Sequence, residues 1–373
     1  MNLFTTPHEK SKTRVVVAMS GGVDSSVAAS LAHQAGYDVV GVTLQLYDYG
    51  QAQGKKGTCC AGQDIYDARV VADKMGFPHY VLDYEQHFKA EVIDDFVDSY
   101  LHGETPIPCV RCNQKVKFKD LLVTAKDLGA QALLTGHYIR RLGGDGQGTL
   151  HQAIDLTRDQ SYFMFATTQE QLDFLRFPLG GMPKTEVREH ARQLGLEIAE
   201  KPDSQDICFV PDGKYAQAIE RLRPGAIESG HIVDPSGNIL GEHSGIIHFT
   251  IGQRRGIGIG GTDPLYVIGL DPVTHQVMVG PKEMLRCESV TLKETNCLIP
   301  TEELAQLENL TVKYRSAQTP VSARFELEPT GAPRVVFLGN EYGVSPGQAC
   351  VFYSGSQVLG GGWIAKSHRY GFK

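Results

Sequence analysis

Residues 14–36, RVVVAMSGGVDSSVAASLAHQAG, contain an apolar run, a glycine-rich turn and an apolar helical segment, in that order. RVVVAM is typical of a buried strand, and SSVAASLAHQAG is typical of a helix that ends at a glycine. Ser20, Gly21 and Gly22 let the backbone approach a ligand closely, and the free N–H groups of the next helix favour an anion. A Walker loop would need a lysine before its Ser/Thr. The stretch therefore predicts a different phosphate-binding loop, at the carboxyl end of a parallel strand.

The alternation of apolar runs and helical patterns continues to about residue 200. Further strands are expected at residues 38–46, 79–83 and 132–138, and further helices at residues 64–76 and 117–129. Strands separated by helices pair in parallel through right-handed crossovers. The fold class predicted for residues 1–212 is therefore α/β, a doubly wound parallel sheet.

The texture of the sequence changes after about residue 212, where glycine and proline become frequent and the apolar period shifts toward two. Residues 264–280 predict a hairpin. Short strand-like segments follow it, namely SVTLKETN, LTVKYRS, VSARFELE, RVVFLG and ACVFYSGSQVLGGGWI. Regularly spaced short strands are typical of a small barrel or sandwich. We predict a small central domain at residues 213–282 and a C-terminal β-barrel at residues 283–373.

The composition is that of an ordinary folded protein, with 41% hydrophobic and 21% charged residues. The 36 basic and 43 acidic residues give a net charge of −7, which argues against a wholesale nucleic-acid binder but allows local basic patches. The N-terminus has no apolar signal region, and the apolar runs are too short to cross a bilayer. We therefore expect a cytoplasmic protein without a membrane partner, whose eight cysteines are reduced thiols.

The segment TPIPCVRCNQKVKF, residues 105–118, holds Cys109 and Cys112 in a C-x-x-C spacing. No second pair of zinc-ligand spacing follows, which argues against a complete zinc site. Cys208 in KPDSQDICFV would ordinarily be a buried structural thiol, but cysteines in two loops of a phosphate-binding enzyme favour sulfur transfer. Positive neighbours such as Lys117 are expected to lower the pKa of Cys112. The other cysteines are expected to be incidental or to serve packing: Cys59, Cys60, Cys287, Cys297 and Cys350.

The loop SGGVDSS resembles the PP-loop of the N-type ATP pyrophosphatases, which split ATP into AMP and pyrophosphate. This implies ATP as a cofactor and makes Asp24 a candidate for holding Mg²⁺. The motifs TP-x-P-C-x-x-C-N, K-x-K-F, TGHY, RDQSYF, DS-x-x-IC-F, GQRRGIGIGG and SPGQACVFY follow along the chain. Together they resemble the tRNA-specific 2-thiouridylase (MnmA) family over nearly the whole length. The resemblance implies a tRNA-uridine 2-sulfurtransferase that uses ATP to replace the uracil 2-oxygen at the wobble uridine of tRNA.

The resemblance also implies roles for individual residues. It places the sulfur-transfer nucleophile at Cys112 and the persulfide at Cys208. It places ATP contacts at Ala18, Met19, Ser20, Gly21, Gly22, Val23, Asp24, Ser25, Leu44 and Gly136. It places contacts with the target base or other parts of tRNA at Ile107, Pro108, Cys109, His137, Arg158, Asp159, Gln160, Tyr314, Arg315 and Gln348. No metal ligand is firmly assigned.

The expected mechanism starts from the poor leaving-group character of a uracil oxygen. Transfer of AMP to that oxygen creates a good leaving group, and sulfur from a Cys208 persulfide then attacks the ring carbon, directly or as released sulfide. Cys112 closes a transient disulfide with Cys208 that a reductant reopens. The persulfide would be loaded by a sulfur-relay protein or a cysteine desulfurase. Candidate phosphate-binding cations are Lys115, Lys117, Lys119, Arg140, Arg141, Arg254 and Arg255.

Three alternatives remain open from the sequence. Cys109, Cys112 and Cys208 match the ligand set of an iron–sulfur cluster with one open iron that delivers sulfide. A second alternative is an AMP-forming synthetase that acts on a small molecule. The third is a tRNA-binding module that has lost catalysis, against which the intact SGGVDSS loop argues.

Overall fold

The quoted stretch forms a strand, a loop and a helix in the predicted order. β1 (Arg14–Ala18) leads into the glycine loop at residues 20–22, and α1 (Val23–Gln34) begins directly after it. The computed structural model describes every residue except 6–7, 48–59, 204–206, 211–212, 262 and 370–373. The chain divides into two units. The first comprises Met1–Val92, Cys109–Phe209 and Ser356–Val358, and the second comprises Ile93–Pro108, Val210–Gly355 and Leu359–Lys373.

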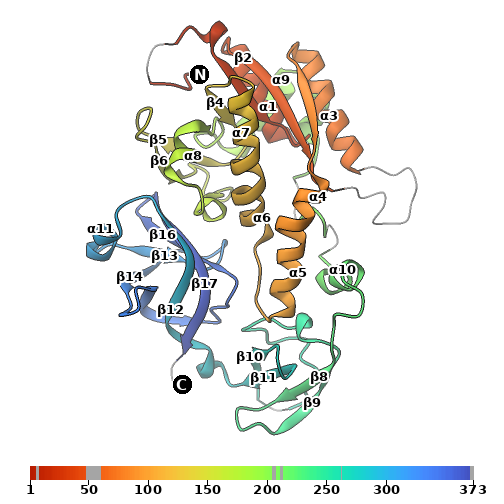
Figure 1. Ribbon diagram of the computed structural model, residues 1–373, viewed down its shortest axis with the longest axis vertical. Helices are drawn as coiled ribbons and strands as arrows, with labels where there is room; N and C mark the ends of the chain where they lie inside the picture. The colour runs from red at the N-terminus through yellow and green to blue at the C-terminus, as the bar shows by residue number, and fades with distance from the viewer. Residues whose placement is uncertain (6–7, 48–59, 204–206, 211–212, 262, 370–373) are drawn as a thin grey trace. The chain divides into compact units, whose positions relative to one another are not determined.

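The first unit is built on a five-stranded parallel sheet (Figure 1). The strand order is β3 (His79–Asp83), β2 (Asp38–Gln45), β1, β4 (Ala132–Leu134) and β7 (Leu175–Arg176). Val15 of β1 pairs with Val39 on one side and with Ala132 on the other. Val15, Val16 and Val17 have no exposed surface, because helices cover both faces of the central strand. The prediction of a doubly wound parallel sheet is confirmed.

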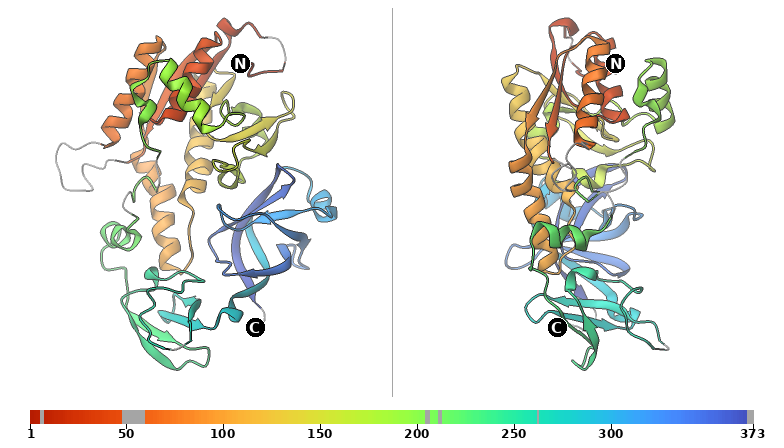
Figure 2. Two further views of the ribbon diagram at one scale, coloured as in Figure 1. Left: turned by 180° about the vertical axis from the view of Figure 1, so that it is seen from behind. Right: turned by 90° about the vertical axis from the view of Figure 1, so that its right-hand side faces the viewer.

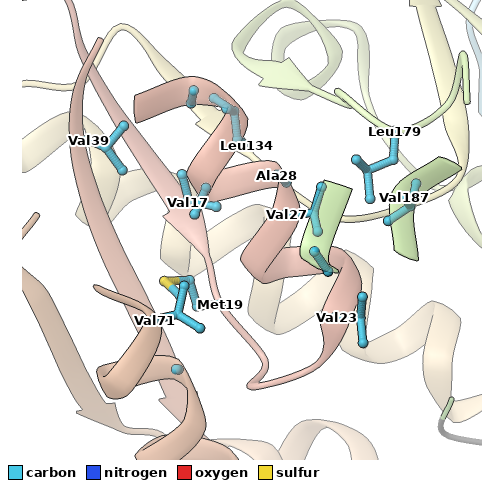
Figure 3. Close-up of a cluster of buried hydrophobic side chains, with 14 of the residues drawn as sticks. Val17, Met19, Val23, Val27, Ala28, Val39, Val71, Leu134, Leu179 and Val187 are labelled. Carbon is cyan, nitrogen blue, oxygen red and sulfur yellow. The ribbon is translucent and has the colours of Figure 1, made fainter. Parts of the chain in front are cut away.

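Helices on both faces fix the position of the glycine loop. α1, α3 (Cys60–Met75) and α9 (Lys184–Gln193) lie on one face, and α7 (Leu121–Asp127) lies on the other (Figure 2). Val17 of β1 packs in one buried cluster with Val27 of α1 and Val187 of α9 (Figure 3). This packing holds the first turn of α1 at the carboxyl end of β1.

Two predicted elements have different bounds in the structure. The strand expected at residues 132–138 ends at Leu134, because the next residues leave the sheet to pack on α1. A Cβ at Gly136 would lie 2.7 Å from the backbone nitrogen of Ser25, so only glycine allows this approach. The helix expected at residues 117–129 starts earlier, as the π-helix η3 (Cys112–Asp120) that runs into α7.

The remaining elements complete the two units. Those that lie in or begin the first unit are η1 (Lys10–Lys12), α4 (Glu85–Phe88), η2 (Lys89–Ile93), β5 (Ile139–Leu142), β6 (Thr149–Gln152), η4 (Ser161–Met164), α8 (Gln169–Phe174) and η5 (Glu197–Glu200). The helical elements that lie in or begin the second unit are α5 (Asp94–Leu101), α6 (Pro108–Arg111), α10 (Tyr215–Leu222), η6 (Ile246–His248), η7 (Lys282–Leu285) and α11 (Thr301–Gln306). Its strands are β8 (Gly230–Val233), β9 (Ile239–His243), β10 (Tyr266–Asp271), β11 (Gln276–Gly280), β12 (Arg286–Cys297), β13 (Thr311–Lys313), β14 (Val321–Leu327), β15 (Pro333–Tyr342), β16 (Ala349–Ser354) and most of β17 (Gln357–Arg369).

The second unit contains a four-stranded sheet and a β-barrel. The sheet has the order β10-β11-β8-β9, and β10 and β11 form the predicted hairpin. The barrel has the order β12-β15-β14-β13-β16-β17 and closes through pairing of β12 with β17. The predicted C-terminal β-barrel is thereby confirmed. Cys287 and Cys350 lie in its buried core and Cys297 packs against that core, as predicted for packing residues.

Two other statements from the sequence concern Cys59 and Cys60, and the possibility of a membrane span. Cys59 lies outside the described residues, and Cys60 begins α3 with a side chain that is also outside them. The reading of both as incidental stays a prediction. In the part of the chain that is described, no helix has the length and apolar character needed to span a membrane.

Candidate active site

A cavity of about 230 Å³ lies at the carboxyl ends of β1, β2 and β4, the edge at which open α/β sheets bind ligands. Most of the predicted ATP residues line it: Ala18, Met19, Ser20, Asp24, Ser25, Leu44 and Gly136. It is also lined by Val42, Leu46, Lys117, Leu121, Thr135, His137 and Gln160. The structure therefore brings the predicted nucleotide residues together with two predicted tRNA residues, His137 and Gln160.

The other predicted ATP residues shape the loop without lining the cavity. Gly21 has a φ of +72°, which favours glycine, and a Cβ there would lie 2.1 Å from the carbonyl oxygen of Asp64. Gly22 is the N-cap of α1 in an extended conformation. The side chain of Val23 is 4% exposed and packs in the hydrophobic core. Any contact of these residues with a nucleotide would thus be made by the backbone.

A buried lysine that the sequence analysis missed lies behind the loop. Lys184 is 7% exposed, and its ammonium donates to both carboxylate oxygens of Asp24 at 2.7 and 2.8 Å and pairs with Asp203 at 2.8 Å. The Tyr138 hydroxyl also donates to Asp24, at 2.8 Å. Burial and the charge of Asp24 raise the pKa of Tyr138, so its hydroxyl stays protonated. The sequence feature that could have revealed this residue is its position in the first turn of α9, where the helix dipole disfavours a cation.

The C-x-x-C segment continues into the π-helix η3. Hydrogen bonds in a π-helix join residues five apart, as the backbone N–H of Leu121 and the carbonyl of Val116 do here. Residues five apart therefore lie one turn apart on the same side of the helix. Cys112 and Lys117 are such a pair, and Lys117 also lines the nucleotide cavity. π-helical turns are rare in proteins, and those that occur are often found at functional sites. The π-helical register of η3 therefore indicates a functional site.

The charge environment of Cys112 differs from the prediction. Burial raises the pKa of its thiol, Lys117 lowers it, Cys109 raises it, and the net shift is upward. The prediction that positive neighbours lower this pKa is wrong in its net effect, because Cys112 is only 6% exposed and burial disfavours the thiolate. Burial lowers the pKa of Lys117, but the charges of Cys112, Cys109 and Cys208 raise it above its usual value.

Cys208 belongs to the same electrostatic environment. The protein atoms around it raise the pKa of its thiol to about 12, with further upward contributions from Cys112 and Cys109 and a downward one from Lys117. Its side chain nevertheless keeps solvent exposure. Phe209, the next residue, is 1% exposed and packs edge-on against Phe88 with ring centroids 5.9 Å apart. The sulfurs proposed from the sequence thus lie within electrostatic range of one another and of Lys117.

The three thiols do not have the arrangement of a metal site. Within the described ranges, no three His, Cys, Asp or Glu side chains converge as ligands of a metal ion. Cys109, Cys112 and Cys208 are all described, and they do not form such a group.

His137 has the properties of a neutral contact residue in the cavity. Its Nδ1 lies 2.8 Å from the Thr135 hydroxyl oxygen. Burial, followed by the charge of Lys117, lowers the pKa of His137 to about 3. The imidazole is therefore uncharged at neutral pH and can recognise a ligand only by hydrogen bonding or stacking.

Arg158 and Asp159 do not line the cavity. Arg158 pairs with Asp203 at 2.8 Å. Asp159 accepts hydrogen bonds from the backbone N–H and the hydroxyl of Ser161, at 3.2 and 2.7 Å. Asp159 therefore shapes its own turn, which holds the neighbouring Gln160 toward the cavity.

The predicted base-contact segment has mixed exposure. Ile107 and Pro108 are buried, and Cys109 at the start of α6 is exposed. In the second unit, Tyr314 is 4% exposed and donates its hydroxyl to Glu341 at 2.6 Å. A contact of Tyr314 with RNA would therefore have to use its backbone.

Other predicted RNA contacts have internal partners. Arg315 donates to the carbonyl of Gly343, and the Gln348 amide donates to the carbonyl of Thr105 at 2.9 Å. The candidate phosphate-binding cations divide by exposure: Lys119, Arg254 and Arg255 are exposed, whereas Lys115, Lys117 and Arg140 are half-buried. Arg141 does not fit that role, because its side chain is 7% exposed and donates to the carbonyls of Leu172 and Gly144.

Comparison with known proteins places this site in a family. Residues 13–212 match the family described as tRNA methyl transferase HUP domain, residues 219–281 its PRC-barrel domain, and residues 287–364 the aminomethyltransferase beta-barrel domain. The tRNA-specific 2-thiouridylase MnmA of Rhodospirillum centenum is 59% identical, with 95% of this chain and 92% of the relative aligned. That of Paracoccus denitrificans is 58% identical, with 100% and 96% aligned. The chain belongs to the tRNA-specific 2-thiouridylase family.

Solved structures of other enzymes resemble this thiouridylase family member only distantly. A 4-thiouridine synthetase in complex with RNA and ATP aligns with 56% of this chain and 51% of its own, at 20% identity and a TM-score of 0.35. An NMN synthetase from Francisella tularensis aligns with 57% and 76%, at 18% identity and a TM-score of 0.34. These similarities are too low to bear on function, and the family assignment depends on the full-length relatives.

The raised thiol pKa values predict slow alkylation of this thiouridylase at neutral pH. Below the pKa the thiolate fraction rises tenfold per pH unit, so iodoacetamide should modify Cys208 about tenfold faster with each unit from about pH 7.5 to about pH 9.5. Lys117→Met should slow the reaction several-fold, whereas Lys119→Met, an exposed residue of the same helix, should leave it unchanged. Peptide mass spectrometry measures each rate. A rate at Cys208 that reaches a plateau below about pH 9 would contradict the upward shift.

Proposed function

We propose that this chain is a tRNA-uridine 2-sulfurtransferase that adenylates the wobble uridine of tRNA and replaces its 2-oxygen with persulfide-derived sulfur. The observation that carries the proposal is the position of Lys117. This residue lines the predicted nucleotide cavity and interacts electrostatically with Cys109, Cys112 and Cys208. An enzyme that must activate an oxygen with ATP and then deliver sulfur to the same carbon needs both chemistries in one place.

The first step transfers AMP from ATP to the uracil 2-oxygen and releases pyrophosphate. The backbone N–H groups at the start of α1 and its positive dipole favour the phosphate charge. Mg²⁺ binds through one or two carboxylates together with substrate phosphates, and Asp24 is the cavity carboxylate that would hold it. When bound there, the ion would neutralise charge on the phosphates.

The second step transfers sulfur from Cys208. The terminal sulfur of a Cys208 persulfide attacks the ring carbon, and AMP leaves with the original oxygen. Attack of the Cys112 thiolate on the Cys208 sulfur then forms the Cys112–Cys208 disulfide and leaves the terminal sulfur on the base as 2-thiouridine. In the alternative route, Cys112 attacks the Cys208 persulfide first, which forms the same disulfide and releases sulfide. The sulfide then attacks the ring carbon. A thiol reductant restores both cysteines, and a cysteine desulfurase or a sulfur-relay protein reloads the persulfide.

The other functions considered have less support. The iron–sulfur route has no support from the described cysteines, which form no group placed to hold a metal ion. An AMP-forming synthetase for a small molecule would not need the thiols beside the cavity. The full-length relatives are also named as tRNA-specific enzymes, which argues against a small-molecule substrate. We place the reaction in the cytoplasm, where tRNA is the available substrate.

The proposal is tested by incubating the protein with ATP, a persulfide donor and unmodified tRNA, followed by mass analysis of the nucleosides. The expected product is 2-thiouridine at the wobble position, with AMP and pyrophosphate formed only when tRNA is present. AMP formation that is independent of tRNA, without any thiolated nucleoside, would favour the small-molecule synthetase instead. A tRNA in which the wobble uridine is replaced by cytidine is the matched control and should give no product.

A further inference from the structure

The C-x-x-C pair lies at the start of a long helical run. Pro108 is the first residue of α6, and the run continues through η3 and α7 to Asp127. Proline is favoured at the first helical position, because an N–H would have no intrahelical partner there and the φ of proline already suits a helix. Cys109 therefore lies in the first turn, and Cys112 follows it by three positions.

Residues three apart lie on the same side of a helix. Their Cβ atoms are about 5–6 Å apart in an α-helix, whereas a disulfide needs about 3.5–4.5 Å. Side chains three apart eclipse one another in a 3₁₀ turn, a form that helix ends commonly take, so a tightened first turn closes the difference. Arg111, between the two cysteines, has right-handed helical backbone angles, with φ −58° and ψ −43°. The local geometry thus brings Cys109 and Cys112 within reach of a disulfide.

The two sulfurs differ in their access to solvent. Cys109 is exposed, whereas Cys112 is 6% exposed. Thiol–disulfide exchange requires that the attacking thiolate reach a sulfur of the disulfide. A protein reductant can therefore attack Cys109, but burial keeps it from Cys112. A disulfide that includes Cys109 can be reopened from solution at its exposed sulfur.

The electrostatic environment of the thiols is consistent with Cys112 as the middle member of the three. Burial is the main cause of the raised pKa values of Cys112 and Cys208, and neighbouring thiols add to it. Cys109 further raises the pKa of Cys112. Cys112, and after it Cys109, further raise the pKa of Cys208. Cys112 therefore interacts with both other thiols, and it acts on Cys208 more strongly than Cys109 does.

We propose that Cys109 is a second resolving thiol, which attacks the Cys112 sulfur of the Cys112–Cys208 disulfide and frees Cys208 for the next persulfide. The Cys112–Cys208 disulfide rests on the proposed function, whereas the pairing of Cys109 with Cys112 rests on the helix geometry and on the exposure of the two sulfurs.

The exchange step involves no net oxidation or reduction. The Cys109–Cys112 bond forms as the Cys112–Cys208 bond breaks, and the electron pair of the broken bond leaves with the Cys208 sulfur, which takes up the proton that Cys109 lost. A dithiol reductant of the thioredoxin class then supplies two electrons and reopens the Cys109–Cys112 disulfide. Cys208 also keeps solvent exposure, but a reductant that attacked it would leave its own sulfur on the carrier and block reloading.

The pairing is tested without ATP or tRNA, so the result does not depend on the proposed function. Cys208→Ser protein is equilibrated in mixtures of reduced and oxidised glutathione, the remaining thiols are blocked with N-ethylmaleimide, and unreduced peptides are mapped by mass spectrometry. A Cys109–Cys112 disulfide is expected, and adding Cys297→Ser, a change in the barrel wall, should leave it in place. If Cys112 stays reduced in oxidised glutathione alone, the pairing is overturned.

The relay is tested in the complete reaction, with ATP, a persulfide donor, unmodified tRNA and thioredoxin as the reductant. Wild-type protein quenched after one turnover without reductant should carry the Cys109–Cys112 disulfide and a reduced Cys208. Cys109→Ser should complete one turnover and hold the Cys112–Cys208 disulfide. Its later turnovers should be at least about tenfold slower, because the intramolecular exchange is lost and thioredoxin must attack the carrier itself.

A small reductant separates this role from a structural one. Dithiothreitol at high concentration should restore the later turnovers of Cys109→Ser, because a small dithiol reaches the exposed Cys208 sulfur. A loss that dithiothreitol does not restore would place the defect before the disulfide and would overturn the relay. Equal steady-state rates with thioredoxin, or a Cys112–Cys208 disulfide in the quenched wild-type protein, would also overturn it. Absence of 2-thiouridine from the wild-type reaction would instead overturn the proposed function.

Discussion

Replacement of Cys208 with serine is expected to lower the rate of 2-thiouridine formation by about four orders of magnitude or more, as removal of a nucleophile commonly does. The first chemical step should survive, because Cys208 is not among the residues that line the nucleotide cavity. Formation of AMP and pyrophosphate in the presence of tRNA should thus continue while sulfur transfer stops. The two readouts are nucleoside mass analysis and pyrophosphate release. Thiolated tRNA formed at the normal rate would remove Cys208 from the mechanism.

Two further cysteine variants sharpen this result. Cys112→Ser should leave sulfur transfer stalled after the attack on the base, so protein and tRNA become joined through Cys208 by a disulfide that added thiol releases. Absence of that species, with sulfide present in solution, would favour the route through released sulfide. Cys297→Ser, in the half-buried wall of the barrel, is the control and should keep normal activity.

Gly21→Ala is expected to abolish ATP binding and to destabilise the first unit by about 2–5 kcal/mol. The new methyl group would need an unfavourable positive φ and would overlap the carbonyl oxygen of Asp64, only 2.1 Å away. Relief of that overlap requires movement of the loop or of α3. Gly22→Ala is the matched control. Gly22 has an extended backbone, and its nearest atom to a new Cβ is the Ser20 hydroxyl at 3.5 Å.

Urea unfolding and calorimetric titration with ATP distinguish the two glycine variants. Gly22→Ala should fold within about 1 kcal/mol of the wild-type protein, while Gly21→Ala shows the large loss. An equal loss of unfolding free energy in the two variants would mean that the close approach of Asp64 is not the cause, and that the loop tolerates no side chain at either position. Normal ATP affinity in Gly21→Ala would show that the loop does not hold the phosphates.

Local sequence patterns predicted the elements whose formation depends on neighbouring residues. The valines of β1, the glycine turn and the apolar side of α1 are contiguous, so their order could be predicted directly. The barrel strands could be predicted by their period, whereas the closure of β12 on β17 could not, because it joins residues far apart in the chain. Lys184 was missed for the same reason, since 160 positions separate it from Asp24.

The electrostatic error at Cys112 has a different cause. Sequence shows which charges are nearby along the chain, but it does not show how much water they retain. Lys117 acts on Cys112 in the predicted direction, and burial outweighs it. The π-helical register of η3, which determines that Lys117 and not its neighbours lies on the side of Cys112, also leaves no apolar period that a helix prediction would detect.

Three residues near the end of the chain, 356–358, belong to the first unit. Gln357 and Val358 pair with His151 and Leu150 of β6, and the Gln152 backbone N–H donates to the carbonyl of Ser356 at 2.8 Å. A fragment cut near residue 212 would lack these three residues and expose the backbone of β6 as an open edge, which favours aggregation. Separate expression of the nucleotide-binding part would therefore require that residues 356–358 be grafted back or that β6 be protected by a charged or proline substitution.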